Sequence, residues 1–217
     1  PDDWLVTQTE KGQDLQQYRL GGPHISWLNP KLEGTIYLFL IDGTISEEMA
    51  GQFKAYCQAF YHGVNVKMVR PGSKIYEKQR NGTNIVKKTV PADFVTTHRI
   101  PSRQNGGYFQ LKASDILHAL KEYKVKDTFC ILAVTNNDLY PRDSWNFVFG
   151  LANMGTKCGV FSFARHAEMS ESGLSEEEQK QIWMRRSCST MVHEIGHMFG
   201  LKHCIYYECT MNGSNGA

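Results

Sequence analysis

Three histidines near the end of the chain have the spacing of ligands to a single metal ion. Residues 193–203 read His-Glu-Ile-Gly-His-Met-Phe-Gly-Leu-Lys-His. On a helix, His193 and His197 lie one turn apart on the same face, so both imidazoles can reach one ion. Gly200 can adopt a positive φ, which allows the helix to end and the chain to turn back. The turn would bring His203 to the same ion as a third ligand.

This ligand set predicts a catalytic zinc site. Zinc favours imidazole ligands, and three protein ligands leave its fourth position open for water. Glu194 is rotated about 100° from His193, which places it beside the metal rather than on it. There its carboxylate can accept a proton from zinc-bound water. The opposing interpretation is a helix that presents paired histidines to solvent, but Ile195, Met198 and Phe199 indicate that this end of the helix is buried.

The residues after the third histidine narrow the assignment. The extended motif is that of the metzincin metallopeptidases. Cys204 follows His203 directly, Cys209 comes five residues later, and Met211 comes two residues after that. This pattern resembles the archaemetzincins, and in particular their eukaryotic members. Residues 138–150 and 159–165 also resemble that family. The resemblance covers most of the chain and is weakest between residues 71 and 106.

The resemblance implies a role for each residue of the motif. His193, His197 and His203 would bind the catalytic zinc, and Glu194 would be the general base. Met211 would form a hydrophobic floor under the metal without ligating it.

By the same resemblance, Cys204 and Cys209 are half of a second, structural zinc site, which a later Cys-x-x-Cys pair completes. No such pair follows before Ala217, and two thiolates cannot complete a tetrahedral zinc site. Three interpretations stay open: a chain truncated within a longer protein, a disulfide between the two cysteines, and two free thiols. The first of these predicts an incomplete C-terminal subdomain.

The predicted activity is zinc-dependent hydrolysis of bonds in a peptide or protein substrate. Metzincins lay the substrate along an exposed edge strand, and the resemblance assigns that strand to residues 145–150. Two other functions compete: a catalytically inactive zinc-binding or scaffold protein, and a metal-dependent nuclease with the same histidine spacing. Glu194 favours the peptidase, because a structural site does not need an acid beside an open position and such nucleases lack this glutamate. Endo- and exopeptidase action are both open.

Alternating strand and helix patterns upstream predict an α/β fold. The apolar run 35–41, the amphipathic stretch 46–62 and the alternating residues 64–68 form a strand–helix–strand unit with parallel strands. Ser175 and Glu178 match a capping box that begins the helix with the histidines. The expected architecture is a metzincin-like zincin domain, with a twisted mixed β-sheet of four to five strands and an active-site helix. The other predicted elements are a helix at 114–123, strands at 128–135, 145–149 and 159–165, and short strands near 85–90 and 94–100.

Composition limits the partners and the compartment. Lys and Arg number 24 against 22 Asp and Glu, so the net charge of +2 favours neither nucleic acid nor acidic lipid as a partner. The longest apolar runs, 35–41 and 128–135, are far short of the ~20 residues that span a bilayer. Four of the six cysteines lie in apolar segments and are expected to be core thiols. The chain has no apolar leader, so the expected location is cytoplasmic or nucleocytoplasmic; the oligomeric state is not predicted.

Two regions are expected along the chain. Residues 1–33 are polar and are predicted to form an irregular N-terminal extension that wraps a surface. Residues 34–217 are predicted to form the metzincin-like catalytic domain.

Overall fold

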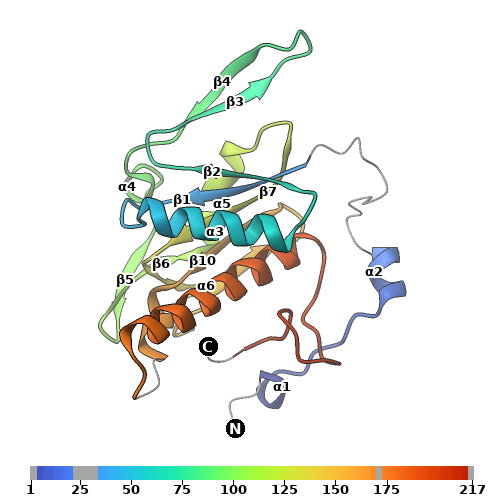
Figure 1. Ribbon diagram of the computed structural model, residues 1–217, viewed down its shortest axis with the longest axis vertical. Helices are drawn as coiled ribbons and strands as arrows, with labels where there is room; N and C mark the ends of the chain where they lie inside the picture. Colours follow the sequence, from blue (N-terminus) through green and yellow to red (C-terminus); the bar gives the residue numbers. More distant parts are fainter. Residues whose placement is uncertain (1–3, 22–33, 170–172, 215–217) are drawn as a thin grey trace.

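A five-stranded mixed sheet lies at the centre of the fold, in the order β2-β1-β7-β10-β9 (Figure 1). The computed structural model describes residues 4–21, 34–169 and 173–214. The first four strands in this order are parallel and β9 is antiparallel to β10. The predicted α/β class and mixed sheet are therefore confirmed. The strands are β1 (Thr35–Leu40), β2 (Asn65–Val69), β7 (Thr128–Thr135), β9 (Gly150–Asn153) and β10 (Cys158–Ser162).

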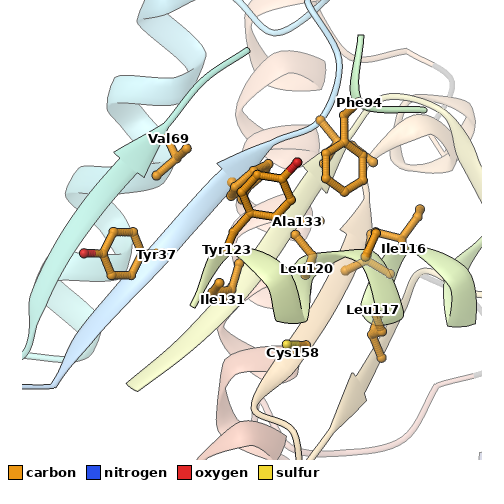
Figure 2. Close-up of a cluster of buried hydrophobic side chains, with 14 of the residues drawn as sticks. Tyr37, Val69, Phe94, Ile116, Leu117, Leu120, Tyr123, Ile131, Ala133 and Cys158 are labelled. Carbon is orange, nitrogen blue, oxygen red and sulfur yellow. The ribbon is translucent and has the colours of Figure 1, made fainter. Parts of the chain in front are cut away.

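Strands β1 and β7 are continuous apolar runs because helices cover both faces of the sheet. Helices α3 (Glu47–Phe60) and α6 (Glu176–Met198) cover one face, and α5 (Ala113–Leu120) covers the other (Figure 1). Successive side chains of a strand point to opposite faces. Leu38 accordingly packs in the core with α3 and α6, and Phe39 packs in the core with α5. Figure 2 shows the α5 side, where Ile116 and Leu120 face Ile131 and Ala133 of β7.

Smaller elements complete the fold. Residues 74–89 form a hairpin that projects from the body (Figure 1). A three-stranded sheet has the order β5-β6-β8, and its strand β8 contacts β10 of the main sheet. None of the described helices is long and apolar enough to cross a membrane. The smaller strands are β3 (Lys74–Lys78), β4 (Asn84–Thr89), β5 (Ser102–Asn105), β6 (Tyr108–Lys112) and β8 (Asp138–Tyr140), and the remaining helices are α1 (Trp4–Thr7), α2 (Leu15–Gly21), α4 (Phe94–Thr97) and the 3₁₀ segments η1 (Lys121–Tyr123) and η2 (Ala164–Met169).

Two predicted strands are wrong. Residues 94–97 form helix α4, because the Asp93 side chain accepts a hydrogen bond from Thr96 N and caps a helical turn. Residues 145–149 make only an isolated bridge, between Leu139 and Val148, and the antiparallel edge strand begins at Gly150.

The predicted N-terminal extension contains α1 and α2. Residues 22–33 of it lie outside the described part of the chain.

Candidate metal centre

Helix α6 carries His193, Glu194 and His197. It begins with the predicted capping box, in which Ser175 and Glu178 exchange hydrogen bonds between side chain and backbone. Its apolar residues between Trp183 and Met198 pack with α3 and the sheet, which holds the part of the helix that carries the histidines. Gly200 adopts a φ of 95° just after the helix ends, and the chain turns back as predicted.

The three predicted histidine ligands meet at one point. One ring nitrogen of each lies within 4.8 Å of the others. His193 Nε2 and His197 Nε2 are 3.0 Å apart, and two nitrogens bound tetrahedrally to zinc are separated by roughly 3.3 Å. Within residues 4–21, 34–169 and 173–214, this is the one group of three or more potential ligands close enough to share an ion.

Hydrogen bonds decide which ring nitrogen faces the centre. His193 Nδ1 lies 2.7 Å from the carbonyl oxygen of Thr210, and His197 Nδ1 lies 2.7 Å from that of Leu201. A carbonyl oxygen can only accept, so each Nδ1 must carry the proton and donate it. Each Nε2 then keeps a lone pair that is directed at the centre, as a metal ligand requires.

The third ring has the same arrangement with a different partner. His203 Nδ1 lies 2.8 Å from Glu10 Oε1, which leaves His203 Nε2 for the centre. Burial, and then the neighbouring His197, lower the pKa of His193 to about 4. Burial also lowers the pKa of His197. Metal ligation needs neutral imidazoles, so the donor set fits a zinc ion.

Glu194 lies beside this cluster in a nearly closed environment. Only 6% of the surface of Glu194 is exposed to solvent, and burial raises the pKa of its carboxyl to about 8. A bound cation would lower that pKa again. Glu194 lines a cavity of about 520 Å³ together with His193 and His203. Glu194 is therefore an acid that lies next to the histidine centre and can exchange a proton.

Gly150 makes room for the Glu194 carboxylate. A Cβ atom added at Gly150 would lie 2.5 Å from Glu194 Cδ, far inside van der Waals contact. Only a glycine at the start of β9 allows the carboxylate to sit where it does. The sequence motif gives no sign of this requirement, because the two residues are far apart in the chain.

The loop after the third histidine packs against α6 and supports the histidine cluster. Met211 Sδ packs against Gly196, where an added Cβ would lie 2.5 Å from the sulfur. The Met211 carbonyl accepts a hydrogen bond from Cys204 N at 2.8 Å. The Asn212 side chain also binds the Cys204 carbonyl at 2.8 Å. These bonds hold the loop in place, and with it the Thr210 carbonyl that orients His193.

Cys204 and Cys209 lie next to each other at the surface. Both are free thiols, Cys204 partly exposed and Cys209 exposed, so the structure contains no disulfide between them. Backbone hydrogen bonds from Tyr206 and Tyr207 lower the pKa of Cys204. Burial raises the pKa of Cys209. No third ligand accompanies the two thiols among the described residues.

Residues 145–149 line one rim of the cavity and do not form a strand. Arg103 of β5 donates to the carbonyl oxygens of Asp143, Trp145 and Asn146. Arg165 lies over the Phe147 ring at 3.9 Å. Long-range arginine contacts, together with the isolated bridge at Val148, therefore fix the rim.

His166 also lines the cavity, although nothing in its sequence context marks it. It is buried, and its ring stacks on Phe149 with the centroids 5.0 Å apart. His166 Nε2 lies 3.2 Å from Thr190 Oγ1. Burial, followed by the charge of Arg186, lowers the pKa of His166 to about 4. The ring is neutral near pH 7 and forms part of the cavity wall.

The fold is shared with an archaemetzincin of known structure. The crystal structure of archaemetzincin from Methanopyrus kandleri superimposes with a TM-score of 0.59 at 24% identity, over 87% of this chain and 86% of that one. Residues 74–217 match the model of peptidase family M54.

Curated relatives match almost the whole chain. Human archaemetzincin-2 is 34% identical over 99% of this chain, and human archaemetzincin-1 is 29% identical over 98% of it. The chain spans 61% of the length of the first relative and 44% of the second. The chain belongs to peptidase family M54, and the predicted resemblance to archaemetzincins is confirmed.

Proposed function

We propose that the chain hydrolyses peptide bonds in a zinc-dependent reaction at the histidine centre, with Glu194 as the general base. The observation that carries the proposal is the convergence of one ring nitrogen from each of three histidines beside a buried carboxyl group, at a cavity that His193, Glu194 and His203 line. Family membership supports the class of reaction. His193, His197 and His203 would hold the zinc. Bound there, zinc would polarise the scissile carbonyl and acidify a neighbouring water molecule.

Glu194 would move the protons. Its carboxylate would accept a proton from the attacking water and then pass it to the nitrogen of the leaving amine. Burial supports this role, because an acid in a closed site has a pKa close to the working pH. The low exposure of Glu194 also keeps bulk water away from the proton that it transfers.

The substrate is proposed to be an extended peptide or protein segment. β9 is the last strand of the main sheet, so its outer edge has no strand partner among the described residues. Backbone groups at such an edge can pair with an added strand. β9 begins at Gly150, directly beside Glu194. A second hollow of about 330 Å³ shares His203 with the main cavity, so a peptide could continue past the metal.

Cys204 and Cys209 are proposed to be half of a second zinc site. Their adjacent thiols and the backbone N–H groups that favour a thiolate at Cys204 support this role. Tetrahedral zinc would need two more ligands.

Metal removal tests the proposed activity. Wild-type protein is expected to cleave a mixture of synthetic peptides, and cleavage is expected to stop after zinc is removed with a chelator that is then dialysed away. One equivalent of zinc should restore cleavage, because the apo ligands are held in place by their own hydrogen bonds. Mass spectrometry of the products measures both the rate and the position of the cut. Equal cleavage by metal-free and zinc-loaded protein would overturn the proposal.

A further inference from the structure

His203 is the one histidine of the centre that α6 does not carry. His193 and His197 are on the buried part of a 23-residue helix, but His203 follows in a segment without regular secondary structure. A ligand on such a segment needs support from elsewhere to keep its geometry. That support comes from the other end of the chain.

The N-terminal strap, residues 10–18, is hydrogen-bonded to the turn that leads to His203. Gln13 Nε2 donates to the Gly200 carbonyl and Gln13 Oε1 accepts from Lys202 N, both at 3.1 Å. Tyr18 Oη donates to the Phe199 carbonyl at 3.1 Å. Figure 1 shows the blue N-terminal segment passing beside the red loop that follows α6. The strap therefore holds both sides of the turn.

Glu10 brings a carboxylate from this strap onto the ligand itself. Its two oxygens lie 2.8 and 3.0 Å from His203 Nδ1. About a quarter of the Glu10 side chain and a fifth of the His203 side chain are exposed, so water screens the pair only in part. The contact engages Nδ1, so Nε2 is the nitrogen of His203 that can ligate an ion shared with the other two histidines. The Nδ1 atoms of His193 and His197 contact neutral carbonyl oxygens, whereas His203 Nδ1 contacts the carboxylate of Glu10.

We propose that Glu10 is a positioning residue of the metal centre, which fixes the ring orientation and the proton position of His203 and thereby strengthens zinc binding. The inference rests on the proposed zinc site. A carboxylate that accepts from the outer nitrogen of a ligating histidine selects the tautomer and raises the basicity of the ligand. Its negative charge also offsets part of the charge of the metal. The N-terminal strap would then be part of the centre rather than a separate extension.

Zinc affinity tests this role directly. The full chain and its Glu10→Ala and Glu10→Gln variants are titrated at pH 7 against a chelator of known affinity. Glu10→Ala is expected to weaken zinc binding by about 10–100-fold. Glu10→Gln keeps an acceptor oxygen and loses the charge, so its affinity should lie between the other two. The visible spectrum of the cobalt-substituted protein provides a second readout, because it responds to the position of the His203 ring.

Asp14→Asn is the matched control. It removes one negative charge from the same strap and keeps a side chain that can cap α2, where Asp14 Oδ1 accepts from Gln17 N. Its zinc affinity should stay within about twofold of wild type. A Glu10→Ala variant that is folded and binds zinc as tightly as Asp14→Asn would overturn the role of Glu10 alone. If Glu10→Ala does not fold, a Glu10→Gln affinity equal to wild type, with an unchanged cobalt spectrum, overturns it. A wild-type chain that binds no zinc would instead overturn the proposed function.

Discussion

A Glu194→Gln variant is expected to lose about 10²–10⁴-fold in kcat while it keeps its zinc. The glutamine amide has nearly the shape of the carboxyl group but cannot accept the proton of the attacking water. The three histidines and the hydrogen bonds that orient them are untouched by the change. Peptide cleavage and zinc content are measured on the same preparation, so that loss of metal is separated from loss of the base.

Glu177→Gln is the control, because it makes the same chemical change on an exposed residue in the first turn of the same helix. It should cleave at the wild-type rate. The comparison also separates the competing functions. A metal-dependent nuclease activity should survive the loss of Glu194, and a zinc-binding scaffold should show no activity to lose. Near-normal peptide cleavage by Glu194→Gln would contradict the role of general base.

A Gly150→Ala variant is expected to lose about 100-fold in kcat, although residue 150 carries no reactive group. The new methyl group would occupy the space of the Glu194 carboxyl, with Cδ only 2.5 Å away. The carboxyl must therefore shift, and a displacement of about 1 Å at a reacting group can cost on the order of 10²-fold. The three atoms nearest to this methyl group all belong to Glu194, so zinc content should be unchanged. Steady-state kinetics and metal analysis together measure the effect.

Gly155→Ala is the matched glycine control. An added Cβ there meets only Asn153 Oδ1, at an ordinary contact distance of 3.5 Å. This variant should keep wild-type turnover. If Gly150→Ala also turns over within about threefold of wild type, the carboxyl of Glu194 is not held where the structure places it.

The parts of the structure that depend on residues close together in the sequence were predictable. The capping box at Ser175 and the positive φ at Gly200 define both ends of the helix that carries the ligands, and each depends on a few residues of local sequence. The apolar run 128–135 matches β7 residue for residue. Local signals failed where a distant contact decides the structure. The alternating aromatic residues at 145–149 have the sequence pattern of a strand. Contacts with Arg103 and Arg165 instead hold this segment at the rim of the cavity.

The candidate site also has some features that local sequence sets and others that distant contacts set. The motif predicts which side chains converge, because a helical turn and a glycine exit bring His193, His197 and His203 together. It does not predict what orients them. Glu10 lies 193 residues before His203 in the chain, and Gly150 meets Glu194 only through the packing of β9 on α6. Such partners become visible only when the fold brings distant segments together.

Zinc content measured per chain, by mass spectrometry on protein purified without chelator, is the most direct test of the proposed centre. The wild-type chain and a His197→Ala variant are compared. We expect the variant to hold one zinc fewer per chain than wild type, because two remaining imidazoles cannot replace three convergent ligands. Any zinc bound by Cys204 and Cys209 would be present in both samples and would not alter that difference. Equal zinc content in the two proteins, or none in wild type, would contradict a zinc centre built on the three histidines.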